Sequence, residues 1–243
     1  MKLLLIADAH ANAVALNTLD DIVGDVDLTV FAGDFLDWGF YPNETMAWFR
    51  QRKHIAVLGN HDEGLIGIFR SPSFHLPAVA PSFIEYTLGK LTPEHFAHLT
   101  QYPTAVSFEA DGVLYHMSHT FGTDLHELPQ VHAAELFETI WNQAGLPYAP
   151  QRRILFDHSH LRSCYDVGEG RLFLNPGSLS YRKGADHVHY GGEYMLIENT
   201  IVSMGHFDYP TEDIHRRLEA SHFTEEVKAA SRRCFAPVKK INR

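Results

Sequence analysis

Residues 55–62 read Ile-Ala-Val-Leu-Gly-Asn-His-Asp, a short apolar run followed by three polar side chains. The β-branched and aliphatic residues 55–58 predict a buried strand, which ends at the glycine. We expect the Asn-His-Asp that follows to lie in a loop at the end of this strand. One strand with a polar end is ordinary, so its meaning depends on how the other strands of the chain end.

Four further apolar runs end in side chains that bind metals or exchange protons. They are Leu3–Ile6 before Asp8 and His10, Leu28–Phe31 before Gly33 and Asp34, Val113–Met117 before His119, and Ile154–Phe156 before His158 and His160. Five strands that all end in Asp, Asn or His predict a single site at one edge of a sheet.

The first 60 residues alternate between strand and helix signals. Apolar runs predict strands at residues 2–7, 28–32 and 55–58. Between them, a helical period of apolar residues predicts a helix at 12–23, and a proline opens a second helix at 42–52. Short connections in this β-α-β-α-β order favour parallel strands covered by helices.

The rest of the chain predicts further strands and helices and one irregular stretch. Residues 63–90 contain three prolines, and we interpret them as a packed loop or cap within a possible insert at 62–103. In chain order, the remaining elements are a helix at about 92–101, a hairpin at 105–117, a helix in the second half of 125–144, a hairpin at 164–174, a polar loop at 183–192, strands at 194–197 and 201–206, and one amphipathic helix at about 211–233. We expect a single domain over residues 1–243, with a C-terminal strand and helix at 205–243.

Composition narrows the classes of function. A chain of 243 residues with 45% hydrophobic content buries a sizeable core. The net charge of −10 disfavours long nucleic acids, which need clustered lysine and arginine, but it does not exclude phosphate chemistry at a site that binds cations. No apolar run approaches the ~18 residues of a membrane-spanning helix, and the N-terminal run is shorter than that of a signal peptide. Cys164 and Cys234 form no metal or redox motif, so we expect a cytoplasmic location.

The polar strand ends have the chemistry of a hydrolytic site with two metal ions. Such a site needs several oxygen or nitrogen ligands, one carboxylate that reaches both ions, and a water held between them. Asp34 suits the bridging position because Gly33 lets the backbone come close, and Asn60 offers an amide oxygen. His119 follows its strand whereas His116 lies within it, so we favour His119 as the ligand from this strand.

Two pairs of ligands come from short His-containing segments. Asp8 and His10 stand two apart in one loop, so both turn toward one ion. His158 and His160 have the same spacing, which puts both imidazoles on one side of an extended segment. Mixed imidazole, carboxylate and amide ligands suit Mn, Fe, Zn, Ni or Co better than Mg, which prefers oxygen alone.

These motifs together resemble the calcineurin-like metallophosphoesterase superfamily, and more narrowly its bacterial and archaeal phosphodiesterases and protein-phosphatase-like members. The resemblance rests on Asp8-x-His10, Gly33-Asp34, Gly59-Asn60-His61-Asp62, a histidine after the fourth strand, and His158-x-His160 close to Asn175-Pro176-Gly177-Ser178. It covers residues 2 to about 230, and the order of its five motifs makes it highly specific. It implies an α/β fold, a four-layer α/β/β/α sandwich of two mixed sheets, with a dinuclear metal site at the carboxyl ends of the strands.

The resemblance also implies a role for each site residue. Two divalent transition-metal ions would share Asp34, with Asp8, His10 and His160 completing one metal site and Asn60, His119 and His158 the other. A hydroxide bridging the ions would attack phosphorus, and His61 would protonate or stabilise the leaving oxygen. No covalent intermediate is expected.

The sequence departs from the family's pattern next to two of these motifs. Asp157 stands where the family has a glycine before His-x-His, and it either tolerates a positive φ or hydrogen-bonds a ligand histidine. The segment that follows Asp34 keeps Asp37 as a partner to orient His61. It has Trp38, however, where the protein phosphatases have a phosphate-binding arginine.

Two residues are candidates for substrate binding. Arg182 follows the Asn-Pro-Gly-Ser segment closely and is able to bind substrate phosphate in place of the missing arginine. Asn12 either caps the helix that it opens or contacts the substrate.

We therefore expect a metal-dependent phosphoesterase, in the first place a phosphodiesterase that acts on a small molecule and binds neither membranes nor long nucleic acids. Phosphomonoester or phosphoprotein hydrolysis is the alternative within the family, and the missing arginine disfavours phosphoproteins. A non-catalytic metal-binding scaffold for protein interactions is the alternative from another class, which the intact ligand set disfavours. The sequence leaves open the metal, the natural substrate and the oligomeric state, including a homo-oligomer.

Overall fold

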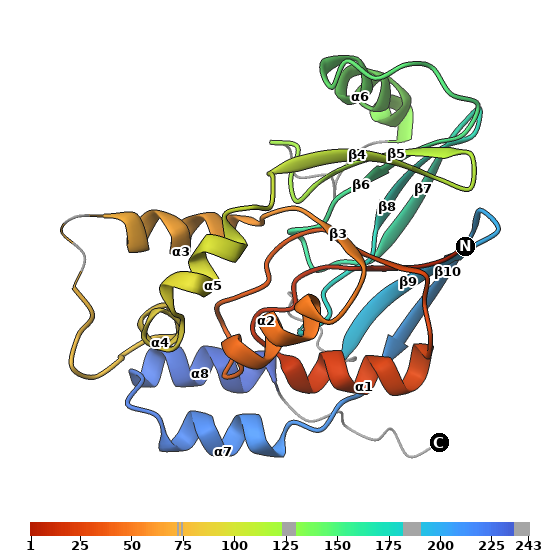
Figure 1. Cartoon of the computed structure of the whole chain (residues 1–243). Coiled ribbons are helices and arrows are strands. Elements are labelled where there is room, and N and C mark those ends of the chain that lie inside the picture. Colours follow the sequence, from red (N-terminus) through yellow and green to blue (C-terminus); the bar gives the residue numbers. More distant parts are fainter. Residues whose placement is uncertain (72, 74, 123–129, 182–190, 236–243) are drawn as a thin grey trace, which may run out of the picture.

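A computed structural model describes residues 1–71, 73, 75–122, 130–181 and 191–235 and contains two five-stranded sheets (Figure 1). The first has the order β10-β9-β1-β2-β3, with β1 Lys2–Ile6, β2 Leu28–Phe31, β3 His54–Ala56, β9 Gly192–Glu198 and β10 Ile201–Phe207. The second has the order β4-β5-β6-β8-β7, with β4 Ala105–Ala110, β5 Val113–Ser118, β6 Arg152–Leu155, β7 Ser163–Gly168 and β8 Arg171–Asn175.

Both sheets mix parallel and antiparallel pairs. In the first sheet β1, β2 and β3 run parallel, and β9 and β10 complete it in antiparallel pairs. In the second sheet β5, β6 and β8 run parallel, and β4 and β7 are the antiparallel edges. β2 and most of β1 are buried, which explains why their sequences are continuous apolar runs.

The sheets pack face to face and helices cover their outer faces, as Figure 1 shows. Leu5 and Val30 of the first sheet share a core with Tyr115, Met117 and Leu155 of the second. The helices α1 Ala13–Val23 and α2 Pro42–Arg50 share a core with the outer face of the first sheet, and α6 Gln130–Gln143 packs on the second. This arrangement confirms the predicted α/β sandwich of two mixed sheets.

Residues 60–99 form three helices, which are α3 Asn60–Arg70, α4 Phe83–Lys90 and α5 Pro93–Leu99. The predicted loop after Gly59 is therefore wrong, and the irregular interpretation of 63–90 is wrong for α3 and α4 but correct for the described residues between Arg70 and Phe83. Two glycines inside α3 lower its intrinsic helix propensity and mask its apolar period. Burial of Leu65 and Ile66 in the core on the outer face of the first sheet outweighs that weak local preference.

The C-terminal region forms two helices, α7 Glu212–Ala220 and α8 Glu225–Cys234, so the single helix predicted at 211–233 is wrong. Between them Phe223 is only 5% exposed, and its ring centroid lies 5.7 Å from that of Phe40 and 4.5 Å from that of Phe83. Thr224 then starts α8, because its side chain accepts a backbone hydrogen bond of 3.3 Å from the first turn. A tertiary contact breaks the helix, and helical periodicity does not reveal such a contact.

Two further sequence predictions concern a polar loop and membrane-spanning helices. Arg182 and nearly all of the predicted polar loop at 183–192 lie outside the described residues. Among the residues that the structure describes, we find no helix of sufficient length and apolar character to span a bilayer.

Candidate metal centre

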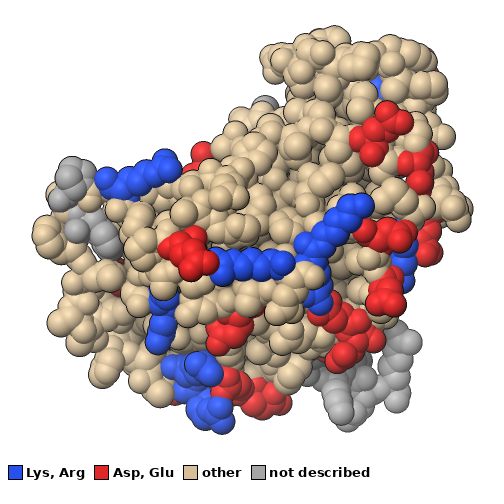
Figure 2. All heavy atoms as spheres, viewed as in Figure 1, with Lys and Arg blue, Asp and Glu red and all other residues tan. Residues whose placement is uncertain are grey.

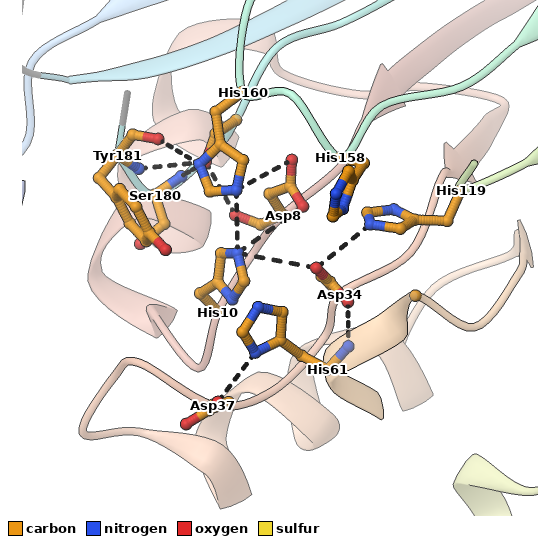
Figure 3. A network of polar contacts seen from close by, with 12 residues as sticks. Asp8, His10, Asp34, Asp37, His61, His119, His158, His160, Ser180 and Tyr181 are labelled. Atoms are coloured by element: carbon orange, nitrogen blue, oxygen red, sulfur yellow. Dashed lines mark hydrogen bonds and ion pairs between the residues drawn. The ribbon is translucent and has the colours of Figure 1, made fainter. Parts of the chain in front are cut away.

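Loops at the carboxyl ends of β1, β2, β3, β5 and β6 meet at one edge of the sandwich (Figure 3). They bring together the seven predicted metal ligands, which are Asp8, His10, Asp34, Asn60, His119, His158 and His160. The first three strands belong to one sheet and the last two to the other. The cluster therefore depends on how the two sheets pack.

Five of these seven residues have a left-handed backbone. The φ angle is 50° at Asp8, 45° at His10, 62° at Asp34, 76° at His158 and 59° at His160. This conformation is uncommon for residues other than glycine, although Asp and His adopt it more readily than most, and it persists where the surroundings stabilise it. Here the N–H of Asp8 donates to the Gly33 carbonyl at 2.9 Å, and the N–H of His10 donates to the Asp34 carbonyl at 3.1 Å. The fold thus holds the ligand loops in one fixed shape.

One group of ligand atoms surrounds the Asp8 carboxylate. His10 Nε2 lies 3.7 Å from Asp8 Oδ1, and His160 Nε2 lies 3.7 Å from Asp8 Oδ2. The two Nε2 atoms are 3.4 Å apart, and all three side chains are buried. Two nitrogens and a carboxylate thus converge on a volume the size of one ion.

A second group is joined to the first by the Asp34 carboxylate. Asp34 Oδ2 lies 3.9 Å from His10 Nε2 and 3.3 Å from His119 Nε2. On the far side, Asn60 Oδ1 lies 3.1 Å from His119 Nε2 and 2.8 Å from His158 Nδ1. Asp34 therefore stands between the two groups of ligand atoms, where a bridging carboxylate would stand.

Backbone carbonyl groups orient three of the imidazoles. The Nδ1 atom of His10 lies 3.4 Å from the Leu36 carbonyl oxygen, that of His119 lies 2.8 Å from Ala32, and that of His160 lies 2.8 Å from Tyr181. A neutral imidazole that donates from Nδ1 keeps a lone pair on Nε2. All three Nε2 lone pairs then face the centre, so the residues fit divalent cations with borderline nitrogen and carboxylate ligands.

The electrostatics of the cluster agree with a cation site. Burial alone would lower the pKa of His119, but the adjacent Asp34 carboxylate raises that pKa to about 9. Burial alone would raise the pKa of Asp34, but His119 and His10 hold it well below its ordinary value. The buried Asp34 carboxylate is thus stabilised by a positive charge beside it, and a divalent ion supplies more positive charge than a proton does.

His61 lies beside the cluster with Asp37 as its partner. His61 Nδ1 donates a hydrogen bond of 2.9 Å to Asp37 Oδ2, and its ring makes an edge contact with that of His10 at 5.0 Å. Burial would lower the pKa of His61, but the hydrogen bond to Asp37 and the charge of Asp34 raise it. A protonated imidazole with Nδ1 held in this way is able to donate its second proton from Nε2.

Asp62 is a site residue that the sequence interpretation missed. Its carboxylate accepts backbone hydrogen bonds from Phe35 at 3.1 Å, Leu36 at 3.2 Å and Gly59 at 3.1 Å. Burial and the charge of Asp34 raise its pKa to about 7, and the N–H groups oppose that shift. Asp62 thus ties the loop of Asp34 to the start of α3. An aspartate three residues after Gly59 is typical of the first turn of a helix, and this was the sequence signal for Asp62.

Asp157 is buried next to the centre. It does not have a positive φ, and the left-handed residue of the pair is His158. The first of the two explanations offered for Asp157 is therefore wrong. Burial raises the pKa of its carboxyl group, which interacts with the Asp8 carboxylate. Its backbone N–H donates to the His119 carbonyl at 3.0 Å, so Asp157 also joins the loop after β6 to the loop after β5.

Asn12 and Asn175 hold neighbouring loops by their amide groups. Asn12 is buried, accepts a hydrogen bond of 3.1 Å from the N–H of Ala15 and donates one of 3.1 Å to Ser180 Oγ. Asn175 donates to Ser159 Oγ at 3.0 Å, which fixes the segment between the two ligand histidines.

His116 lies outside the cluster. Its Nδ1 atom is 2.8 Å from Ser107 Oγ in the neighbouring strand β4, and burial lowers its pKa. His119 is thus the histidine from this part of the chain that joins the cluster.

Residues 1–199 match the calcineurin-like phosphoesterase superfamily domain, so the chain belongs to this family. Its members are hydrolases that act on phosphoric esters with divalent metal ions, and the chain is such an enzyme. The family and the kind of enzyme predicted from the sequence motifs are confirmed.

Individual proteins are similar to this chain in sequence or in fold. An uncharacterized protein of Methanocaldococcus jannaschii is 26% identical over 197 residues, which cover 76% of this chain and 79% of that protein. The crystal structure of a metallophosphoesterase from Sphaerobacter thermophilus has a TM-score of 0.71 at 22% identity and covers 95% of this chain and 98% of its own. The crystal structure of a hypothetical protein from Pyrococcus horikoshii has a TM-score of 0.74 at 16% identity, and the match covers 95% of this chain and 97% of that protein. At these identities the two structures show a shared fold.

Proposed function

We propose that this protein is a phosphodiesterase that uses two divalent transition-metal ions, bound by Asp8, His10, Asp34, Asn60, His119, His158 and His160. The observation that carries the proposal is the position of the Asp34 carboxylate. It lies 3.9 Å from His10 of one ligand group and 3.3 Å from His119 of the other. The hydrogen-bonded His61–Asp37 pair next to it supplies an acid for the leaving group.

When bound, the two ions would acidify a water molecule and neutralise the negative charge that develops on the oxygens of the phosphoryl group. Asp34 links the two ligand groups, and the backbone carbonyls keep the imidazole lone pairs aimed at the centre. His61, oriented by Asp37, donates a proton from Nε2 to the oxygen that leaves phosphorus. Outside the described residues, Arg182 is proposed to bind a phosphate oxygen. Asn12 caps α1 by accepting the N–H of Ala15 and donates to Ser180, and we propose that it also contacts the substrate.

Two observations favour a small phosphodiester over a phosphoprotein or a long nucleic acid. Trp38 follows Asp37, so the chain has no cation at the position where the protein phosphatases bind a dianionic phosphate. A diester has a single negative charge and needs less compensation. In Figure 2 the lysine and arginine side chains of the described residues are interspersed with aspartate and glutamate on the face shown, which does not favour a nucleic-acid backbone.

The test is hydrolysis of bis-p-nitrophenyl phosphate and p-nitrophenyl phosphate by metal-stripped protein. Mn, Ni, Zn and Mg are added back one at a time, and bound metal is measured in parallel. We expect turnover of the diester with a transition metal, and a loss of about 100-fold or more in His61→Ala with a less activated diester. His132→Ala is the matched control, because this histidine is exposed on α6 and belongs to neither group of ligand atoms.

Three results would decide against the proposal. Turnover of the monoester alone would make the protein a phosphomonoesterase. Two bound ions without turnover of either ester would favour a metal-binding interaction scaffold. Equal activity of wild type and His61→Ala on every diester would remove His61 from the reaction.

A further inference from the structure

Aromatic rings border one side of the candidate metal centre. The Tyr181 ring centroid lies 5.3 Å from that of His10 and 4.7 Å from that of His160, so it packs against two of the ligand histidines. The Trp38 ring lies 6.2 Å from Tyr181 and 5.9 Å from Phe83, and it is nearly stacked on Phe83. Tyr181 thus lies between Trp38 and the imidazoles of His10 and His160.

The backbone places Trp38 next to the proton donor as well. The N–H of Trp38 donates to Asp37 Oδ1 at 2.8 Å, and the other oxygen of the same carboxylate holds His61. Trp38 is therefore linked to the proposed acid through a single side chain.

The loop that presents Trp38 has an enforced conformation. The φ angle is 71° at Asp37 and 58° at Trp38, in the left-handed region that bulky residues avoid. Gly39 follows at a point where a Cβ atom would lie 2.2 Å from the His10 carbonyl oxygen. Close packing of Gly39 on the His10 loop thus fixes the unfavourable conformation of Trp38, and such enforced conformations concentrate at functional sites.

Trp38 differs in exposure from the other two tryptophans. Trp48 is 5% exposed and Trp141 is 1% exposed, both within the core, whereas Trp38 is partly open to solvent. Behind it, Phe83 is 3% exposed and Tyr181 is 4% exposed. A partly open indole supported by buried rings is a rigid surface on which another planar ring stacks at little entropic cost.

We propose that Trp38, supported by Phe83 and Tyr181, stacks on a planar aromatic substituent of the phosphoester substrate, such as a nucleobase or an aryl group. The proposal rests on the function proposed above and adds the class of substituent that the substrate has. A planar ring is favoured over a sugar or an acidic group for two reasons. Trp38 and its two neighbours, Phe83 and Tyr181, are all aromatic, and the carboxylate of Asp37 adjoins Trp38.

The test measures binding of three phosphonates whose C–P bonds resist hydrolysis. They are the analogues of adenosine 5′-phosphate, phenyl phosphate and ribose 5-phosphate, titrated calorimetrically into Mn²⁺-loaded full-length protein. In Trp38→Ala we expect about 5- to 150-fold weaker binding of the two ring compounds and less than about 3-fold change for the ribose compound. Weakening of the adenosine compound alone would assign a nucleobase, and equal weakening of both ring compounds would assign any planar group.

Two conservative variants separate stacking from bulk. Trp38→Phe keeps a planar ring and should retain most of the affinity for the ring compounds, whereas Trp38→Leu is closer to Phe than to Trp in volume, lacks a π face and should behave like Trp38→Ala. Tyr148→Ala is the matched control, because Tyr148 is 78% exposed and belongs to the region of the second sheet near α6. Equal weakening of all three ligands in Trp38→Ala, or none, would overturn the proposal.

Tryptophan fluorescence gives an independent measurement. Stacking of adenine on the partly open indole should quench part of the emission of wild type, and this quenching should vanish in Trp38→Phe. Quenching that persists in Trp38→Phe would contradict the proposal. Turnover of bis-p-nitrophenyl phosphate by the same wild-type sample keeps the two questions separate. Ring-dependent binding without turnover refutes only the proposed function, and turnover without ring-dependent binding refutes only the role of Trp38.

Discussion

Replacing Asp37 with asparagine tests whether His61 acts as the acid for the leaving group. The carboxylate accepts the His61 Nδ1 proton at 2.9 Å, and the side chains of His61 and Asp37 are 23% and 6% exposed. Asparagine tolerates the left-handed φ of 71° at this position, so the loop keeps its shape. The amide still accepts the N–H of Trp38 through its oxygen, but it turns an N–H group toward His61. The substitution therefore removes the charge and the acceptor of the His61 Nδ1 proton, while the loop stays in place.

The geometry sets the size of the effect. A hydrogen bond between a charged donor and a carboxylate contributes about 1.5–3 kcal/mol, which is about a 10- to 150-fold change in rate if the imidazolium is the acid. The direction of the pH dependence follows from the pKa of His61, which Asp37 and Asp34 raise against the effect of burial. The acid form is present below that pKa and is lost as the pH rises through it. In Asp37→Asn the pKa falls, so the alkaline decline in kcat moves to lower pH.

The assay compares two diesters of nearly the same shape and equal charge. Diphenyl phosphate releases a basic phenolate that needs a proton, whereas bis-p-nitrophenyl phosphate releases a stable anion that does not. We expect Asp37→Asn to lower kcat on diphenyl phosphate by about 10- to 150-fold and on the nitrophenyl ester by less than about 3-fold. An equal loss on both esters, or an unchanged pH profile, would refute the assignment of His61 as the acid.

Three further predictions concern metal binding and packing. In Asp34→Asn we expect fewer than two Mn per chain by elemental analysis, and two retained ions would contradict a bridging role. Mn²⁺ at about 100 times its Kd should add about 2.7 kcal/mol to the free energy of unfolding and raise Tm by roughly 5–10 °C, and an unchanged Tm would count against the metal site. Gly39→Ala puts a Cβ 2.2 Å from the His10 carbonyl and should cost about 1–3 kcal/mol in urea unfolding. Gly64→Ala in α3 meets open space and should stabilise by about 0.5–1 kcal/mol; the opposite order would refute the packing argument.

The ends of the strands could be predicted from the sequence because their signals are local. An apolar run that stops at Gly33 or Gly59, directly before a residue able to bind a metal, identifies both the strand and the ligand that the strand positions. Parallel pairing of β1, β2 and β3 then places these ends at one edge, which a β-α-β-α-β order implies. The ligands that follow the strands come together in the structure for this reason.

The features that sequence reasoning missed depend on contacts between distant segments. α8 is separated from α7 because Phe223 packs on Phe40 and Phe83, far away in the chain. Asp62 gains its role from the N–H groups of Phe35 and Leu36, which a different loop supplies. No periodicity in the sequence encodes such partners.

The same kind of contact explains how the centre keeps its shape. His10, His119 and His160 take their orientation from carbonyl groups of loops that follow other strands, and the left-handed backbone turns of Asp8 and Asp34 are held by hydrogen bonds between the loops. Neighbouring loops of the same sheet therefore aim the lone pairs of His10 and His160, and the packing of the two sheets aims that of His119. A cation that binds there needs no reorganisation of the backbone, which is the condition under which electrostatic stabilisation of a transition state is most effective.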